Sequence, residues 1–304
     1  MVKKLISRKR FLSKALTGIT GISLVNKTIG AEYSTAPVMR TIGATGISIT
    51  SVGFGASRTN EESLIRYAVE KGINFIDTGR SYSNGNNERL VGRAIAGKRK
   101  NIVIQSKIRL DPFEVPSMGK GKKGAEEIKN ILYSRLEASL KALNTDYIDL
   151  MLYHDARNEG LLFHPETMKF FSDQKKAGTI KACGFSTHND QMNLVSRNNT
   201  EKFYDSIMVP FNHKGSFIHS VTKDYSEWDQ EQLIGILKEA REKGIGVIAM
   251  KTCSGGTYSP SPGVGPSLPE AVKWVLKHDY ISGAAVAISN FEQADEYLAF
   301  LAGI

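Results

Sequence analysis

Short apolar segments alternate with amphipathic stretches of helical period along the chain after Gly43. Eight of the apolar segments have the length and the apolar content of strands that are buried on both faces. We therefore predict eight strands, at residues 49–56, 74–78, 102–108, 148–154, 181–186, 204–211, 246–251 and 283–289.

Amphipathic helices are expected between these strands, and the clearest of them spans residues 125–143. Its apolar positions recur on one face, at Ile128, Leu132, Leu136 and Leu140. Two pairs with capping-box spacing predict helix starts, and three glycines that favour a left-handed backbone predict helix ends. These signals are Thr59 with Glu62, Ser267 with Glu270, and Gly72, Gly178 and Gly244.

The order of these elements predicts the fold class. Eight strand–helix units follow one another within about 240 residues, and no linker separates them. Alternating strands and helices favour a parallel sheet, and strands buried on both faces suit one closed barrel better than two doubly wound domains. We therefore predict a single α/β domain, a (β/α)8 TIM barrel, at residues 37–304. In that fold the active site lies at the carboxyl ends of the strands.

The composition excludes several classes of protein. Hydrophobic residues make up 41% of the 304 positions, and no apolar run reaches the ~18 residues of a spanning helix, so we expect no integral membrane domain. The net charge is +9, but residues 1–36 carry seven Lys or Arg against one Glu, which leaves +3 for the other 268 residues. So small a charge does not predict a nucleic-acid surface. The two cysteines, Cys183 and Cys253, predict neither a disulfide framework nor a zinc or iron–sulfur site.

The first 36 residues are typical of a targeting segment. A basic stretch precedes the uncharged run 15–25, and small residues follow near Ala31. The Ser-Arg-Lys-x-Phe-Leu motif that begins at Ser7 resembles a twin-arginine export signal, with Lys9 at the second arginine position. We therefore expect a signal peptide that the twin-arginine export machinery recognises, and a periplasmic or exported protein. The alternative is a disordered basic N-terminus on a cytoplasmic protein.

Four residues with acid–base chemistry lie at or just after the ends of the second, third and fourth predicted strands: Asp77, Tyr82, Lys107 and His154. Because the carboxyl ends of barrel strands meet at one mouth, we expect these side chains to converge. A lysine ammonium stabilises a nearby phenolate and lowers the pKa of the phenol, a carboxylate holds the lysine charged, and a neutral imidazole can donate to a carbonyl. The set suits protonation of a carbonyl oxygen during hydride transfer, although each residue alone is more often a packing, capping or surface residue.

The same residues resemble the aldo-keto reductase family, through the motif Asp77-x-x-x-x-Tyr82 and the strand ends Ser106-Lys107 and Tyr153-His154. The resemblance covers residues 38–301 and is closest to a bacterial branch whose members often carry a C-terminal ferredoxin-like extension. We expect no such extension here, and therefore hydride chemistry without an iron–sulfur cluster. Further matching segments are Gly85, 87–94, 184–188, 244–251, Gly255-Gly256 and 288–293.

The resemblance implies a barrel that binds NADP(H) in an extended pose without a Rossmann fold. It implies that Tyr82 is the general acid and that Lys107, Asp77 and His154 tune and orient it. NADP(H) is expected more than NAD(H), although Gln293 stands where the family often has an arginine. The cofactor contacts that the resemblance implies are Ser186 and Thr187 at the carboxamide, Ser254 and Gly255 at the pyrophosphate, and Ser289 and Gln293 at the 2′-phosphate.

We therefore expect an NAD(P)H-dependent oxidoreductase that reduces a small aldehyde or ketone to an alcohol. One alternative is a nicotinamide-nucleotide-binding sensor or partner subunit with vestigial catalysis. Another is a Schiff-base lyase that uses Lys107 or Lys251. Three loop arginines, Arg58, Arg80 and Arg157, favour an anionic carbonyl substrate, with solvated loop charges as the alternative.

Overall fold

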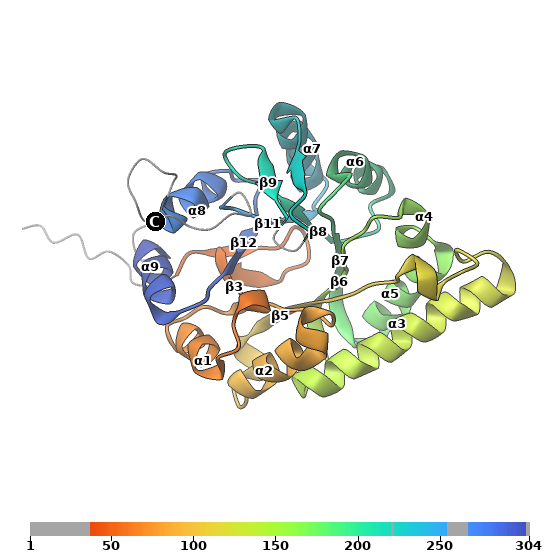
Figure 1. Ribbon diagram of the computed structural model, residues 1–304, viewed down its shortest axis with the longest axis horizontal. Helices are drawn as coiled ribbons and strands as arrows, with labels where there is room; N and C mark the ends of the chain where they lie inside the picture. The colour runs from red at the N-terminus through yellow and green to blue at the C-terminus, as the bar shows by residue number, and fades with distance from the viewer. Residues whose placement is uncertain (1–36, 220–221, 254–266, 302–304) are drawn as a thin grey trace, which may run out of the picture. The chain divides into compact units, whose positions relative to one another are not determined.

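The computed structural model describes residues 37–219, 222–253 and 267–301. Eight parallel strands form a closed barrel in the order β11-β12-β3-β4-β5-β6-β7-β8 (Figure 1). This barrel confirms the predicted fold, and each of its strands overlaps one of the eight predicted segments. The strands are β3 (Val52–Gly55), β4 (Phe75–Asp77), β5 (Val103–Ile108), β6 (Ile148–Tyr153), β7 (Ile180–Ser186), β8 (Ser206–Pro210), β11 (Gly246–Met250) and β12 (Gly283–Ala287).

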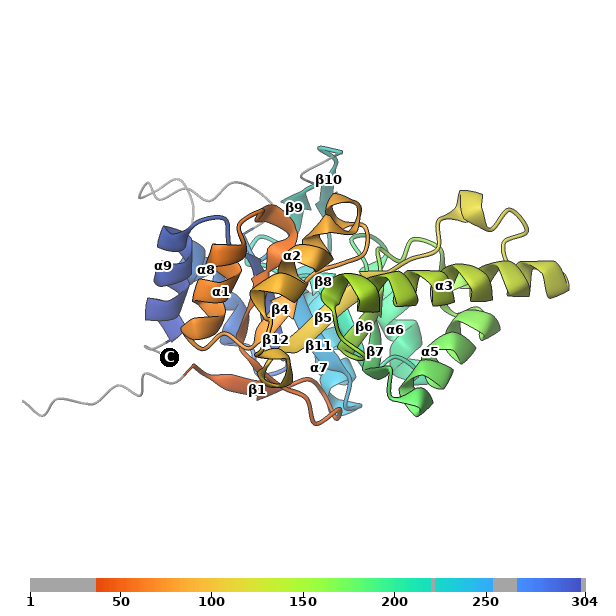
Figure 2. The ribbon, with the colours of Figure 1, turned by 90° about the horizontal axis from the view of Figure 1, so that it is seen from below.

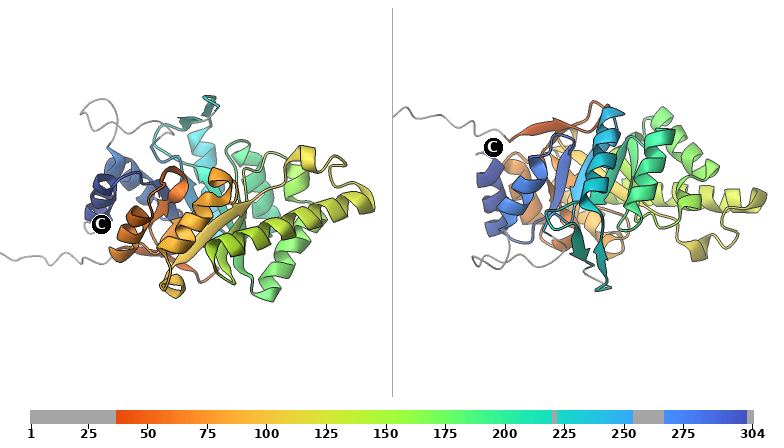
Figure 3. Two further views of the ribbon diagram at one scale, coloured as in Figure 1. Left: turned by 60° about the horizontal axis from the view of Figure 1, so that its bottom comes forward. Right: turned by 90° about the horizontal axis from the view of Figure 1, so that it is seen from above.

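A helix follows each barrel strand along the chain, and the helices surround the barrel (Figure 3). The longest of them begins at Gly121, four residues before the predicted start of this helix. A short additional helix, α4 (Glu159–Leu162), follows β6. The main helices are α1 (Glu62–Glu70), α2 (Asn86–Ala94), α3 (Gly121–Leu143), α5 (Pro165–Ala177), α6 (Gln191–Glu201), α7 (Gln230–Glu242), α8 (Leu268–Leu276) and α9 (Phe291–Leu301).

The first predicted strand, residues 49–56, is two strands in the structure. β2 (Ser48–Thr50) pairs antiparallel with β1 (Met39–Thr41), and β3 begins after Ser51. The turn of this hairpin lies beside the start of β11, where the Ala44 N–H donates to the Gly244 carbonyl at 2.7 Å. The hairpin therefore closes the end of the barrel at which the strands begin. The sequence does not mark this division, because no proline or glycine separates the two strands.

The interior of the barrel is apolar at this closed end. Ile42 and Ile49 of the hairpin segment pack with Phe75, Leu150 and Ile248, and none of the five has any exposed area. Burying side chains of this size stabilises the fold by about 1.5–3 kcal/mol each.

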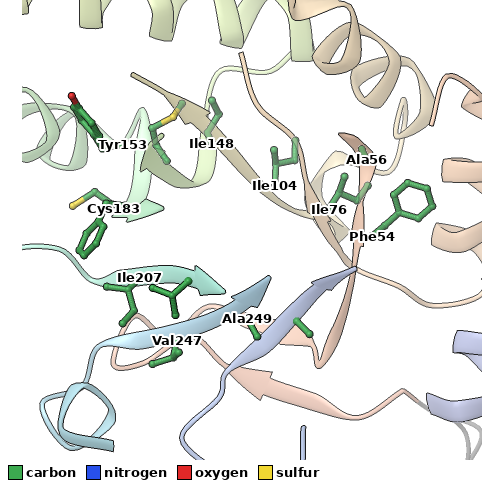
Figure 4. Close-up of a cluster of buried hydrophobic side chains, with 14 of the residues drawn as sticks. Phe54, Ala56, Ile76, Ile104, Ile148, Tyr153, Cys183, Ile207, Val247 and Ala249 are labelled. Atoms are coloured by element: carbon green, nitrogen blue, oxygen red, sulfur yellow. The ribbon is translucent and has the colours of Figure 1, made fainter. Parts of the chain in front are cut away.

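A second apolar layer lies between the barrel and its helices. Figure 4 shows strand residues of this layer, among them Ile76, Ile104 and Ile207. Helix residues of the same cluster include Ile128 and Leu132 of α3, which lie on the apolar face predicted for that helix. Amphipathic helices thus cover a barrel whose strands are apolar on both sides, as the strand composition predicts.

The structure confirms some of the predicted helix starts and ends but not all of them. Ser267 and Glu270 form the predicted capping box, in which the Ser267 N–H donates to the Glu270 carboxylate at 2.8 Å. Thr59 and Glu62 do not, because α1 begins only at Glu62 and the Thr59 hydroxyl accepts instead from the Glu61 N–H at 3.1 Å. The three glycines predicted at helix ends, Gly72, Gly178 and Gly244, all have positive φ.

A second hairpin follows β8 and was not predicted. Its strands, β9 (Ser216–Ile218) and β10 (Tyr225–Glu227), pair antiparallel and lie at the opposite end of the barrel from β1 (Figure 2). Each has only three residues, which is too short for a clear alternation of apolar and polar positions. Across the residues that the structure describes, no helix has the length and apolar character needed to span a membrane. The predicted targeting segment, residues 1–36, lies outside the described residues.

Candidate active site

A cavity of about 810 Å³ opens at the end of the barrel where the strands finish. The four predicted catalytic residues, Asp77, Tyr82, Lys107 and His154, all line it. Asp77 and Lys107 lie at the ends of β4 and β5, and Tyr82 and His154 lie in the segments that follow β4 and β6. The volume lies within the range of small-molecule sites, about 300–1,000 Å³.

Lys107 is the centre of the hydrogen-bond network in this cavity. Its ammonium group donates to the Asp77 carboxylate, to the Thr78 carbonyl at 2.8 Å and to the Tyr82 hydroxyl at 3.2 Å. The Lys107 side chain is only 1% exposed, so these three acceptors replace water as its hydrogen-bond partners. Gln105, which the sequence analysis did not identify, also donates to the Asp77 carboxylate and fixes its orientation. The signal for Gln105 was its position on a buried strand two residues before Lys107.

The pKa values of this network keep Tyr82 protonated and Lys107 charged. Burial disfavours the ammonium, but Asp77 and Tyr82 outweigh that effect and raise the pKa of Lys107. Burial also raises the pKa of Tyr82, and the Lys107 charge offsets this only in part. From the sequence we predicted that the lysine lowers the pKa of the phenol, and its charge does act in that direction without outweighing burial. That expectation neglected the desolvation of a fully buried hydroxyl, which favours its neutral form.

His154 is neutral in this environment. Burial, together with the Lys107 charge, lowers the pKa of His154 well below its ordinary value. Its ring meets the Tyr82 ring edge-on, with 5.7 Å between the centroids, and its Nδ1 lies 3.1 Å from the Ser81 hydroxyl. Ser81 was not a predicted site residue, and its position directly before Tyr82 was the available signal. A neutral imidazole with one nitrogen held by Ser81 leaves the other nitrogen for a ligand.

Tyr82 is positioned by the segment on either side of it. Arg80 lies two residues before it, and its backbone N–H donates to the Lys107 carbonyl at 2.9 Å. The Arg80 guanidinium pairs with the buried Glu88 at 2.8 Å and donates to the Ala138 carbonyl of α3 at 2.9 Å. Arg80 does not line the cavity, which corrects its expected role in substrate binding. Its charge instead compensates the buried carboxylate beneath α2.

The predicted cofactor residues fall into three groups. Ser186, Ser289 and Gln293 line the cavity. Thr187 does not line it, and its hydroxyl donates to the Ala156 carbonyl at 2.9 Å inside the protein. Ser254 and Gly255 lie outside the described residues.

Three cationic or imidazole side chains that were not predicted as site residues also line the cavity, together with Lys251, the second lysine of the Schiff-base alternative: Arg109, His188 and His219. Arg109 follows β5, and Lys251 follows β11, so both occupy strand ends. His188 and His219 meet edge-on, with 5.5 Å between their centroids, so His219, which directly follows β9, contributes to the cavity lining. Burial and the Lys251 charge lower the pKa of His188 to about 3. Among the described residues, no group of three or more His, Cys, Asp or Glu side chains is arranged to hold a metal ion.

This geometry suits proton donation to a carbonyl better than Schiff-base chemistry at Lys107. A Schiff base requires a neutral amine, whereas the partners of Lys107 raise its pKa and hold its ammonium in place. Tyr82, by contrast, retains its proton until a stronger base forms beside it.

Comparison with known proteins agrees with this geometry. The family model described as "Aldo/keto reductase family" matches residues 42–266. The oxidoreductase YqkF of Bacillus subtilis is 28% identical over 271 residues, which cover 86% of this chain and 78% of YqkF. The aldo-keto reductase YhdN of the same organism is 32% identical over 218 residues. Those residues are 67% of this chain and 58% of YhdN, so the match spans little more than half of that relative.

Solved structures show the same fold. The aldo-keto reductase AKR11C1 from Bacillus halodurans superposes with a TM-score of 0.68 at 22% identity, over 87% of this chain and 91% of its own. An aldo-keto reductase from Klebsiella pneumoniae in complex with NADPH gives a TM-score of 0.63 at 20% identity, over 87% and 90%. Together with the family match, the barrel and its four convergent residues lead to one conclusion: this chain belongs to the aldo/keto reductase family of NAD(P)H-dependent oxidoreductases.

Proposed function

We propose that Tyr82 is the general acid with which this enzyme reduces an aldehyde or a ketone to an alcohol. The observation that carries this proposal is the Tyr82 hydroxyl in hydrogen-bond contact with the Lys107 ammonium, inside a cavity that also contains a neutral imidazole. Reduction of a carbonyl adds a hydride to its carbon and a proton to its oxygen. The nicotinamide cofactor, when bound, supplies the hydride.

Tyr82 supplies the proton in this mechanism. As negative charge develops on the carbonyl oxygen, the phenol O–H proton moves to that oxygen and leaves a phenolate. The Lys107 ammonium, 3.2 Å from the phenolic oxygen, stabilises that phenolate. Asp77 keeps the lysine charged and in place. In the opposite direction the same phenolate removes the proton from an alcohol.

His154 orients the substrate carbonyl. We assign the Ser81 hydroxyl, 3.1 Å from His154 Nδ1, as the donor in this contact, which leaves the imidazole hydrogen on Nε2. That N–H then donates to the carbonyl oxygen and aligns it with the Tyr82 hydroxyl. Because burial keeps the pKa of His154 well below its ordinary value, the imidazole does not become a competing acid near neutral pH.

The cavity also offers cations for a phosphorylated cofactor. Arg58 and Lys251 line it, and neither forms an ion pair within the described parts of the chain. The backbone before α9 adds Ser289 and Gln293 to the same lining. Two unpaired cations suit the phosphate groups of NADP(H), and the Klebsiella pneumoniae relative was solved with NADPH. We therefore assign NADP(H) rather than NAD(H), with Ser186 at the carboxamide and Thr187 supporting the loop behind it.

The test is cofactor binding followed by turnover in the full-length protein. NADPH and NADH are titrated by fluorescence, and a panel of aldehydes is then added. We expect NADPH to bind more tightly and to be oxidised, and Tyr82→Phe to lower kcat by about 10²- to 10⁴-fold while binding is retained. Binding without turnover would favour the sensor or partner subunit instead. Binding of neither nucleotide would contradict the proposal.

We further propose that the protein is exported through the twin-arginine pathway. The support is the Ser7 to Leu12 motif and the uncharged run that follows it. Cell fractionation of the full chain in a twin-arginine-competent bacterium tests this, with Arg8→Gln/Lys9→Gln as the comparison. We expect the wild-type chain in the periplasm and the variant in the cytoplasm. An identical distribution would overturn the proposal.

A further inference from the structure

The cationic residues of the cavity fall into two pairs besides Lys107, which Asp77 neutralises. The first pair is Arg58 and Lys251, which line the cavity and form no ion pair within the described parts of the chain. The second pair is Arg109 and Arg157, which follow Lys107 by two residues and His154 by three residues along the chain. Both line the cavity directly after the strand ends that carry Lys107 and His154, so the second pair lies beside the groups that act on the substrate carbonyl.

Arg109 and Arg157 are held in the same way. The Nε of Arg109 lies 2.8 Å from the Asp111 carboxylate, and the Nε of Arg157 lies 2.9 Å from the Asp155 carboxylate. Each aspartate is two residues along the chain from its arginine, so the contact is local and fixes the guanidinium plane. Anchoring at Nε lowers the entropy that the arginine loses when its remaining donors bind a ligand.

The terminal nitrogens of both guanidinium groups are free for a ligand. Within residues 37–219, 222–253 and 267–301, neither Arg109 nor Arg157 makes a hydrogen bond through its terminal nitrogens. The Arg109 side chain is 39% exposed and that of Arg157 is 58% exposed, and both residues line the cavity. Two fixed forks of N–H donors in one cavity match the oxygen atoms of a carboxylate or a phosphate.

We propose that Arg109 and Arg157 form a subsite for the anionic group of the substrate, so that the enzyme acts on carbonyl compounds bearing a carboxylate or a phosphate. The proposal rests on the proposed function, since it places the carbonyl of that substrate at Tyr82 and His154. It also revises the loop-arginine hypothesis drawn from the sequence. Arg80 leaves the set because it pairs with Glu88, Arg58 leaves it because we assign it to the cofactor, and Arg109 enters it.

The experiment compares matched charged and neutral substrates. 4-Carboxybenzaldehyde and methyl 4-formylbenzoate differ by one ester methyl group, and glyceraldehyde 3-phosphate and glyceraldehyde form the phosphate arm. kcat/KM is measured at low salt for the wild type, Arg109→Gln, Arg157→Gln and the double variant. Arg66→Gln, on α1 outside the cavity, removes the same charge as a control.

We expect the wild type to prefer one of the anionic substrates over its neutral partner by about 10- to 100-fold, and the double variant to lose that preference. The preferred arm identifies the anion as carboxylate or phosphate. The double variant loses more kcat/KM toward the anionic substrate than toward its neutral partner, because only the anionic group uses this subsite. Arg66→Gln keeps the wild-type preference. Equal kcat/KM for charged and neutral partners in the wild type would overturn the subsite and leave the proposed function intact.

A binding measurement separates failure of the subsite from failure of catalysis. 4-Carboxybenzaldehyde and glyceraldehyde 3-phosphate are titrated calorimetrically into NADP⁺-loaded Tyr82→Phe enzyme, with and without the two arginine substitutions. Weaker binding in the triple variant supports the subsite even if no aldehyde is turned over. Unchanged binding of both compounds overturns it whatever the activity.

Discussion

At the closed end of the barrel, Ile42 and Ile49 fill the interior together with Phe75, and none of the three exposes any area. At the open end, Asp77 and Lys107 are almost as completely buried but are charged. Apolar burial stabilises the fold directly, whereas a buried ion pair roughly breaks even, because desolvation offsets the attraction between the charges. The closed end therefore stabilises the barrel. At the open end, burial adds little stability but holds two charged groups in the positions that the reaction requires.

The backbone shows the same contrast. The turn of the β1–β2 hairpin uses Gly43 and Gly46 at its positive-φ positions, where glycine has no steric penalty. At the open end, Ser83, Asp155 and Lys251 line the cavity, and all three have positive φ. For residues other than glycine this conformation costs on the order of 1–3 kcal/mol each. Three side chains of the cavity lining thus project from a backbone conformation that glycine adopts without this cost.

The largest expected effect comes from removing one charge of the buried pair. Lys107→Met leaves the Asp77 carboxylate buried with no counter-ion, and we expect the free energy of unfolding to fall by about 3–5 kcal/mol. Urea unfolding followed by circular dichroism measures the loss. Activity falls as well, since Tyr82 loses the group that stabilises its phenolate.

The matched control is the double variant Asp77→Asn/Lys107→Met, which removes both charges. We expect it to recover most of the lost stability but none of the activity, because an amide and a thioether need no counter-ion. A single variant as stable as the wild type would show that the open end does not depend on this pair, and the contrast between the two ends would fail.

The second prediction addresses the closed end. Ile49→Ala creates a cavity among Ile42, Phe75 and Ile248, and we expect the free energy of unfolding to fall by about 2–4 kcal/mol. Well below the melting temperature, kcat and KM stay near wild type, because the active site lies at the opposite end of the barrel. Unfolding curves and steady-state kinetics on the same sample separate the two effects.

Ile218→Ala is the control for this change. Ile218 of β9 is 50% exposed, so the same truncation there costs less than about 1 kcal/mol. If Ile49→Ala lowered kcat as strongly as it lowered stability, the two ends would be coupled and the division of roles would be wrong.

The closed end and the barrel were largely predictable from the sequence, because apolar burial leaves a periodic pattern. All eight barrel strands were found in this way, and so was the apolar face of α3. β2 and β3 were merged into one predicted strand, since no proline or glycine separates them and only the pairing of β2 with β1 marks the division. The β9–β10 hairpin was missed because three-residue strands carry no readable period.

At the open end, the sequence predicted which residues meet but not all of their contacts or the direction of their pKa shifts. Asp77, Tyr82, Lys107 and His154 were found from their positions at strand ends, and the structure brings them together. The direction of the Tyr82 pKa was wrong, because burial cannot be read from a strand-end position. The different roles of Arg80 and Arg109 could not be predicted either, because both residues follow strands. Only the ion pair with the buried Glu88 explains why Arg80 does not line the cavity.

A third prediction concerns pH and uses His188 of the open end. Its folded-state pKa of about 3 lies below its ordinary value, so the unfolded state binds the proton first as the pH falls. Stability is therefore highest above about pH 6.5 and falls by up to about 1.4 kcal/mol per pH unit below it, until about pH 3. His188→Phe keeps an aromatic ring beside Phe217 and His219 but removes the titration.

Unfolding measured at pH 7 and at pH 5 tests this prediction. We expect the difference between the two values to shrink by about 1–2 kcal/mol in His188→Phe. His154, whose pKa is also lowered, accounts for part of the pH dependence of stability that remains in His188→Phe. If the difference between the free energies of unfolding at pH 7 and pH 5 did not change, His188 would be solvated at low pH, and the open end would be more accessible to water than its geometry indicates.

The smallest expected effect tests how the open end positions its charges. Ser81→Ala removes the hydroxyl 3.1 Å from His154 Nδ1, so the imidazole loses the partner that fixes its hydrogen on Nε2. We expect kcat to fall about 3- to 10-fold while the melting temperature and NADPH binding stay unchanged, since one hydrogen bond of this kind is worth about 1 kcal/mol.

Nitrogen NMR of labelled histidine should show a single Nε2–H tautomer for His154 in the wild type and a mixture in the variant. Ser81→Thr retains the hydroxyl and should restore both kcat and the tautomer. A purely structural role for Ser81 would lower the melting temperature and leave the tautomer alone, and that result would remove Ser81 from the groups that position the substrate carbonyl.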